Sequence, residues 1–200
     1  MSFLEQTQGI RDFIRRKVIS SDIDQVNAWV FIWYANSHDM GHASMFIGDI
    51  SKQSSYVSWW PQYHGHVSYF VKYPAGVSNG YEADCSLEKR VPDVVYGLKG
   101  LDDYAMRIAW RDICIKENAS FTLMSKNCSS IVRRILKAGL VHSPLRHKVF
   151  GVMDGGFYTC TPKRVAVVCN NLRDNNMAVK IKMHAKLDHS SIFDVIFRLR

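Results

Sequence analysis

The sequence lacks several features that would restrict where the protein works. No apolar run approaches the roughly 18 residues of a membrane-spanning helix, and the first residues, MSFLEQTQGIRDFIRRKV, lack the apolar core of a signal peptide. Its five cysteines form no Cys-x-x-Cys pair, so a reducing compartment is favoured over a disulfide framework. We therefore expect a soluble chain that stays in the cytoplasm or is exported by a Sec-independent route.

Internal repeats and low-complexity linkers are also missing, which indicates a single folded unit. The composition of the 200 residues, 47% hydrophobic and 22% charged, is typical of a globular domain. Residues 1–24 differ from the rest by an amphipathic pattern, in which apolar residues from Ile10 to Val18 recur at helical spacing beside arginines. We expect an amphipathic helical extension at 1–24 and one domain at 25–200.

Negative charge is scarce in the last third of the chain. Residues 130–200 contain 13 Lys and Arg but 4 Asp and Glu, whereas residues 1–129 contain 13 and 14. Such asymmetry favours an acidic partner, for which an anionic membrane surface, an acidic protein and nucleic acid are the choices. Nucleic acid is the least expected, because aromatic and basic residues are not interleaved as in a stacking platform. A solvated basic face is the alternative.

Apolar periodicity predicts an α+β fold, because strands and helices mix without a regular βαβ repeat. Predicted strands cover residues 28–34, 42–47, 56–60, 66–71 and 179–187, with a short extended piece at 120–123. Predicted helices cover 101–116, 129–137 with a glycine cap at Gly139, and a segment that begins at Thr161-Pro162 and ends near 172. Residues 76–93, rich in Gly, Asn, Asp and Pro, are predicted to be a loop.

Cys128 is the strongest candidate for chemistry. The run Asn127-Cys128-Ser129-Ser130 places this cysteine in the first turn of a predicted helix. A helix N-terminus beside a histidine lowers the pKa of a thiol and makes it a strong nucleophile. Backbone N–H groups of Cys128 and its neighbours would also face a developing oxyanion. The other four cysteines are predicted to be structural.

His42 is the candidate base. It follows Gly41 at the start of a predicted strand, where its ring can reach from the sheet edge to a facing helix. His38 is a nearby alternative. His64 and His66 would share one face of an extended segment, but no further ligand stands at a spacing typical of zinc sites, so no metal is predicted.

Three motifs together resemble the circularly permuted branch of the papain-like (NlpC-type) cysteine enzymes. They are H-x-S-x-x-I-G-D at residues 42–49, Tyr56-Val57-Ser58-Trp59-Trp60-Pro61, and Asn127-Cys128-Ser129-Ser130. In that branch the histidine strands precede the cysteine helix, as in the lecithin:retinol acyltransferase group. The Trp-Pro strand, Leu101-Asp102 and Thr161-Pro162 are similar to bacterial effector members, such as the Rho-inactivation domain of MARTX toxins and IcsB. The resemblance covers about residues 28–170.

The resemblance implies an antiparallel sheet packed on the helix that carries the nucleophile, and a triad in the order His, acid, Cys. Asp84 matches the acidic position, where it would hold the tautomer of His42, with Glu82 and Asp93 as rivals and Asp49 too close to the histidine strand. Asn127 and Ser129 would flank the oxyanion. Trp59 and Trp60, with Tyr69 and Phe70, could line a tunnel for an acyl chain.

The implied activity is that of a thiol acyltransferase or thiol hydrolase. Among effectors of this kind, a lysine fatty-acyltransferase that modifies a host protein, such as a small GTPase, is favoured. It would bind no resident cofactor and would use acyl-CoA as cosubstrate, while the strand from Lys180 to Lys186 could dock on a membrane. A cysteine protease, amidase or deamidase stays open. A non-catalytic basic module that binds membrane or nucleic acid is the rival from another class, and a cell-wall peptidase is disfavoured because no export signal is found.

Overall fold

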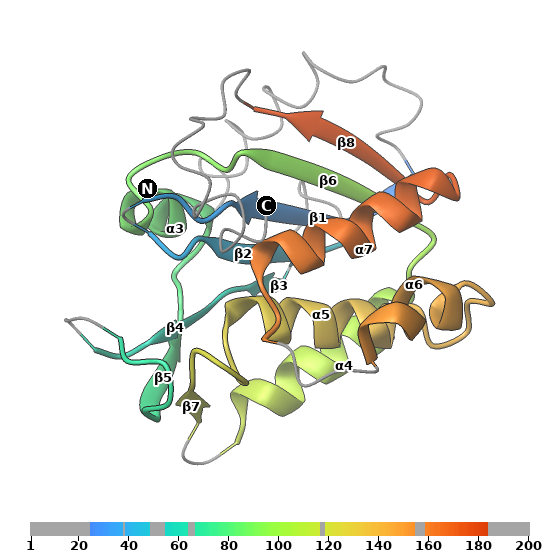
Figure 1. Ribbon diagram of the computed structural model, residues 1–200. Coiled ribbons are helices and arrows are strands. Elements are labelled where there is room, and N and C mark those ends of the chain that lie inside the picture. Colours follow the sequence, from blue (N-terminus) through green and yellow to red (C-terminus); the bar gives the residue numbers. More distant parts are fainter. Residues whose placement is uncertain are drawn as a thin grey trace.

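The centre of the fold is an antiparallel sheet of five strands, in a computed structural model that describes residues 25–37, 39–48, 55–63, 67–116, 119–154 and 159–183 (Figure 1). Its order is β3 (Ser55–Val57), β2 (His42–Ile47), β1 (Val26–Trp33), β6 (Val94–Lys99) and β8 (Ala178–Lys182). Three predicted strands are confirmed as β1, β2 and β8, although the prediction for β8 continued to 187, outside the described residues. The helix predicted at 1–24 also lies outside them. The strand β6 was not predicted.

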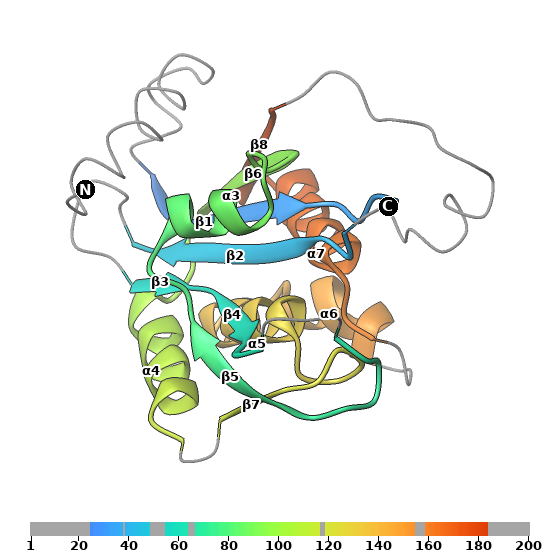
Figure 2. The ribbon, with the colours of Figure 1, turned by 90° about the vertical axis from the view of Figure 1, so that its left-hand side faces the viewer.

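A second, smaller sheet contains β4 (Trp59–Pro61), β5 (Tyr73–Val77) and β7 (Ser120–Phe121) (Figure 2). The strand predicted at 56–60 is therefore divided: β3 pairs with β2, β4 pairs with β5, and Ser58 lies between them. The strand predicted at 66–71 is wrong, because residues 67–71 form no strand and β5 begins at Tyr73. The short piece predicted at 120–123 is confirmed in part as β7.

Helices cover both faces of the large sheet (Figures 1 and 2). One face packs against α4 (Asp103–Cys114), α5 (Cys128–Gly139) and α7 (Pro162–Asp174), with α6 (Arg146–Asp154) against α7. The other face packs against α3 (Tyr81–Leu87), whose Tyr81 ring lies 4.9 Å from that of Phe31. Strand alternation separates the two faces, because Ala28, Val30 and Ile32 join the first cluster and Trp29, Phe31 and Trp33 join the second.

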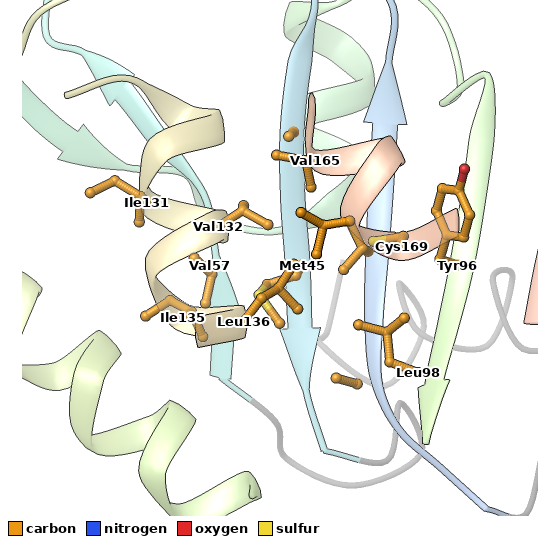
Figure 3. Close-up of a cluster of buried hydrophobic side chains, with 14 of the residues drawn as sticks. Met45, Val57, Tyr96, Leu98, Ile131, Val132, Ile135, Leu136, Val165 and Cys169 are labelled. Carbon is orange, nitrogen blue, oxygen red and sulfur yellow. The ribbon is translucent and has the colours of Figure 1, made fainter. Parts of the chain in front are cut away.

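The larger core lies between β1, β2, β6 and the helices α5 and α7 (Figure 3). Met45 from the sheet lies against Leu136 of α5, Val165 of α7 belongs to the same cluster, and all three side chains are fully buried. The apolar residues of α5 recur with the 3.6-residue period of a helix, and the sequence therefore predicts which face of this helix packs on the sheet.

Local capping signals account for the confirmed helices. The side chain of Asp102 accepts a hydrogen bond from the Ala105 N–H at the start of α4, and Thr161 does the same for the Arg164 N–H at the start of α7, directly before Pro162. The predicted ends of both helices agree with the structure to within a few residues. The helix α6 was not predicted.

Two predictions about glycine and loops are corrected. Residues 76–93 are not a continuous loop, because α3 occupies Tyr81–Leu87. Gly139 is the last residue of α5 and does not adopt the positive φ of a glycine cap. A Cβ at Gly139 would instead lie 2.8 Å from Met106 Sδ, so the glycine lets α5 and α4 approach each other closely.

The fold class is thus α+β with antiparallel sheets, as predicted. Among the described helices, none combines the length and the apolar character needed to cross a bilayer.

The core and the exposed face of α7 should respond differently to the same substitution. Val168 is fully buried, whereas its neighbour Val167 is 40% exposed. We expect Val168→Ala to lower the free energy of unfolding by about 2 kcal/mol, since two buried methyl groups are lost. Val167→Ala, the matched control, should stay within about 0.5 kcal/mol of the parent protein. Urea unfolding followed by circular dichroism measures both, and equal losses would contradict the packing described.

Candidate active site

The start of β2 places His42 at an open edge of the large sheet. β3 pairs only with Met45, Phe46 and Ile47, so residues 42–44 have a strand neighbour on one side, β1. Gly41 precedes the histidine with a φ of +75°, and a Cβ there would lie 2.5 Å from the carbonyl oxygen of Trp33. A glycine is therefore required at this position, because it lets the loop from β1 turn tightly into β2 and present His42 at the edge.

Asp84 of α3 meets His42 in the protein interior. The Nε2 atom of His42 lies 3.1 Å from Asp84 Oδ2, and the two side chains are 1% and 0% exposed. The carboxylate also accepts hydrogen bonds from three side chains: Tyr56 Oη at 2.5 Å, Ser58 Oγ at 2.9 Å and Trp60 Nε1 at 2.9 Å. Burial opposes ionisation of Asp84, but the contacts with His42 and the other hydrogen bonds hold its pKa below the usual value.

The imidazole ring of His42 is held in a fixed orientation. The indole of Trp60 stacks on it, with ring centroids 4.2 Å apart and an interplanar angle of 23°. Trp33, which pairs with His42 across the β1–β2 ladder, has its ring centroid 5.6 Å from that of His42. Because Nε2 faces the acceptor Asp84, this nitrogen carries a proton, and Nδ1 is the ring nitrogen left to exchange a proton with a substrate or a thiol.

Cys128 is the first residue of α5, as predicted. Asn127 caps the helix, since its Oδ1 accepts the Ser130 N–H at 2.8 Å. Its Nδ2 also donates to the carbonyl oxygens of Leu123 and Cys160, both at 2.8 Å. The Asn127 amide thus links the start of α5 to two loops. Both its oxygen and its nitrogen already make hydrogen bonds within the protein.

The Cys128 thiol and the His42 ring interact, and the interaction favours charge separation. Burial opposes the thiolate, but the charge and hydrogen bond of His42, the Ala43 N–H and the Ser129 hydroxyl together lower the pKa of Cys128. Burial likewise opposes protonation of His42, yet the Cys128 thiolate and Asp84 raise its pKa to about 10. Each charge thus favours the other, so the contact shifts the pair toward a thiolate and an imidazolium, the charge state in which a cysteine is the stronger nucleophile.

The beginning of α5 also provides hydrogen-bond donors for a developing oxyanion. As the first two helical residues, Cys128 and Ser129 have backbone N–H groups with no acceptor inside the helix. The Ser129 side chain is buried and its Oγ lies 3.8 Å from the Cys128 Sγ. The arrangement can support nucleophilic attack by sulfur, proton transfer by His42 and stabilisation of negative charge at the helix start.

A second buried carboxyl, that of Glu88, lies close to this group and was not predicted from the sequence. Its burial raises its pKa to about 7, against the opposing charges of His42 and Arg90. Arg90 Nη2 is 3.9 Å from Glu88 Oε2, too far for a hydrogen bond. Glu88 is the C-cap residue directly after α3, and its N–H donates to the carbonyl oxygen of Asp84 at 2.9 Å, one helical turn earlier.

The structure also places the remaining predicted residues. Trp59 lies in the core, edge to face with Trp110, whereas Tyr69 and Phe70 are 51% and 84% exposed and therefore do not enclose a tunnel. Asp93 binds Arg90 and the Tyr34 N–H, so it is not the partner of His42. Glu82 is on α3 but takes no part in the contacts of Asp84 described above. His38, Asp49, His64 and His66 lie outside the described residues.

Tyr56 and Ser58 were missed as members of the site, although the sequence contained a signal for them. In an extended segment, Tyr56, Ser58 and Trp60 alternate with apolar residues and so share one face. All three have a hydrogen-bond donor at the tip, and all three donate to Asp84. Three polar tips on one face of a short extended segment indicate a common acceptor.

Comparison with known proteins identifies one family. A family model described as the IcsB middle domain matches residues 72–191, a segment that contains Asp84 and Cys128 and begins after His42. No curated protein and no solved structure matches the sequence.

Alkylation should distinguish Cys128 from the other thiols. Burial raises the pKa of Cys160 to about 12 and also raises that of the exposed Cys114, whereas that of Cys128 is lowered. At about pH 7 we expect iodoacetamide to modify Cys128 first, at a rate that changes less between pH 6 and 8 than that of Cys114. His42→Ala should slow this reaction about tenfold or more, since one pKa unit changes the thiolate fraction tenfold.

His142→Ala is the matched control, because His142 is exposed and lies beside Asp102, at the N-terminus of α4. It should leave the rate unchanged. Peptide mapping of the alkylated protein assigns the modified thiol. Preferential labelling of Cys114, with Cys128 reacting only near the ordinary thiol pKa, would contradict the ion pair.

Proposed function

The chain belongs to the IcsB middle-domain family, and on this premise we propose that it is a cysteine-dependent acyl-transfer enzyme of a bacterial effector. The observation that carries the proposal is the pairing of the Cys128 thiol with His42, whose other ring nitrogen binds the buried carboxylate of Asp84. A thiol that contacts a histidine, which in turn contacts a carboxylate, is the arrangement of nucleophile, base and orienting acid that supports covalent catalysis. The family takes its name from the effector IcsB, which supports the effector role.

We propose the circularly permuted papain-like fold on the same grounds. The nucleophile is at the N-terminus of a helix, α5, which packs on the strand that carries the base, β2. The sheet is antiparallel, and the three residues follow the chain order His42, Asp84, Cys128. These features support the fold that the motifs at residues 42–49 and 127–130 resemble.

In the proposed reaction the Cys128 thiolate attacks the carbonyl carbon of a fatty acyl thioester. Electrons move to the carbonyl oxygen, which the N–H groups at the start of α5 stabilise. When the intermediate collapses, the thiolate of coenzyme A leaves and takes the proton from His42 Nδ1, so that an acyl-Cys128 thioester and a neutral His42 remain.

A lysine amine of the target protein then attacks the acyl-enzyme. His42 Nδ1 accepts the amine proton, the bond to Cys128 Sγ breaks, and an amide and a free thiolate result. Asp84 keeps the proton on Nε2 throughout, so that Nδ1 alone exchanges protons. Attack by water in place of lysine gives a thiol hydrolase, and the same cleavage of a glutamine side-chain amide gives a deamidase. The resemblance to effector acyltransferases favours lysine, and a host protein such as a small GTPase as the target.

Acyl-enzyme formation tests this proposal directly. Incubation with palmitoyl-CoA should add one palmitoyl group to the intact protein, at Cys128 and labile to hydroxylamine as a thioester is. Cys128→Ala should abolish the adduct, whereas Cys160→Ala, which removes another buried thiol near the helix start, should keep it. Mass spectrometry before and after hydroxylamine is the measurement. An adduct that persists in Cys128→Ala would refute the assignment, and its absence in the parent protein would favour hydrolysis.

Two aspartates provide a matched test of the orienting role. Asp84→Asn should reduce the rate of acyl transfer on the order of 10³-fold, because an amide turns a donor toward Tyr56, Ser58 or Trp60 and no longer stabilises the imidazolium. Asp93→Asn also removes a carboxylate from a close ion pair, in which Asp93 lies 2.6 Å from Arg90, but this pair is away from the thiol. The variant should therefore retain most activity. Single-turnover rates from palmitoyl-CoA compare the two. Equal losses would show that Asp84 contributes only to stability.

A further inference from the structure

An exposed apolar surface lies beside the nucleophile helix. Tyr69, Phe70 and Val71 are consecutive residues between β4 and β5, and Phe70 has the most exposed of the large apolar side chains in the described part of the chain, at 84%. Ile115, at the end of α4, and Met124, in the turn before α5, are exposed as well. Exposed apolar residues that gather in one region mark a site of contact with a protein or a membrane.

Four cations stand among these apolar residues. Lys72 follows Val71 directly, Lys116 follows Ile115, and Lys126 is two positions after Met124. Burial lowers the pKa of Lys126, and so do the charges of Lys116, Arg134 and Lys72, each of which is therefore near enough to act on Lys126. The segments 69–72 and 124–126 adjoin the same end of the small sheet, since Tyr73 pairs with Phe121 and Thr122 with Lys126, and the charge of Lys116 acts on Lys126. We call these nine residues the β5–β7 surface.

We propose that the β5–β7 surface docks on an anionic lipid bilayer. Basic side chains around exposed aromatic and aliphatic ones match the chemistry of such an interface, where the apolar side chains enter the acyl boundary and the cations meet the headgroups. Tyr69 and Phe70 are of the type that anchors at this depth. A soluble anion would use the four cations but leave Phe70 and Ile115 in water, so the apolar residues favour a bilayer.

The basic strand predicted to dock on a membrane is less suited to it. In β8, Lys180 already lies over the Tyr96 ring at 5.4 Å and donates to Asn170 at 3.1 Å. Lys182 is exposed, and Lys186 lies outside the described residues. Within the described part of β8, one lysine is therefore available, and no large exposed apolar side chain accompanies it.

Docking through the β5–β7 surface would bring the bilayer close to the candidate active site. The turn from Thr122 to Lys126 carries Met124 and Lys126, and its Leu123 carbonyl holds the Asn127 cap directly before Cys128. A bilayer against this turn lies next to the start of α5. On the proposed function, acyl transfer would then take place at the bilayer surface.

Vesicle sedimentation tests the proposal. The full chain should bind vesicles of phosphatidylcholine and phosphatidylserine (roughly two to one) more tightly than vesicles of phosphatidylcholine alone, and added salt should weaken the binding. Lys72→Gln and Lys116→Gln should each weaken it about fivefold, as expected for one charge at an anionic surface. Phe70→Ala should weaken it about tenfold through lost apolar insertion.

Matched controls lie elsewhere on the same elements. Tyr104→Ala removes an aromatic side chain that is 75% exposed, at the opposite end of α4 from Ile115, and should bind as the parent does. Lys182→Gln removes the exposed lysine of β8 and should also have no effect. If Lys182→Gln weakens binding and Lys72→Gln does not, or if both vesicle types bind equally, the proposal is wrong.

Two further measurements separate docking from folding and from catalysis. Thermal melting should be unchanged in Phe70→Ala, and Val71→Ser should reproduce its loss of binding; if Val71→Ser binds normally, insertion of this segment is refuted. Cys128→Ala should bind vesicles as tightly as the parent, so failure of the proposed chemistry would leave this result untouched. Loss of binding in Cys128→Ala would refute docking through the β5–β7 surface.

Discussion

The buried carboxylate of Asp84 is the constraint on which the rest of the site depends. An isolated charge in a protein interior costs several kcal/mol unless donors surround it, and here four donors do so. Three of them come from the segment Tyr56–Trp60, which leaves the large sheet at Ser58 to join the small one. That departure exposes the edge of β2, and the open edge lets the thiol of Cys128 reach His42 and the Ala43 N–H.

The same set of contacts favours the charged forms of Cys128 and His42, although both side chains are buried. Burial alone would keep both the thiol and the imidazole uncharged. The negative charge on Asp84 and the donors around the sulfur reverse that preference. The lowered pKa of Cys128 is thus a property of its surroundings, since burial raises the pKa of the similarly buried Cys160.

Much of the candidate site follows from local sequence signals, and the remainder depends on distant partners. His42 and Cys128 stand at element boundaries marked by Gly41 and by the Asn127 cap, and the sequence predicts both from these signals together with the resemblance of the motifs at residues 42–49 and 127–130 to permuted papain-like enzymes. The helix that carries Asp84 was predicted as a loop, because its seven residues follow a Gly- and Asn-rich stretch and are stabilised by packing against Phe31 and by the contacts of Asp84. The break at Ser58 was missed for the same reason: its cause, Asp84, is 26 positions away.

The dispersal of the site over β2, α3 and α5 makes its chemistry conditional on a complete fold. In an extended polypeptide the sulfur is far from the imidazole and regains the modest acidity of a free thiol. During synthesis, before these elements come together, Cys128 is thus not distinguished from the other thiols of the chain. The lowered pKa of its thiol appears only when the strand with His42, the helix with Asp84 and the helix with Cys128 have all packed together.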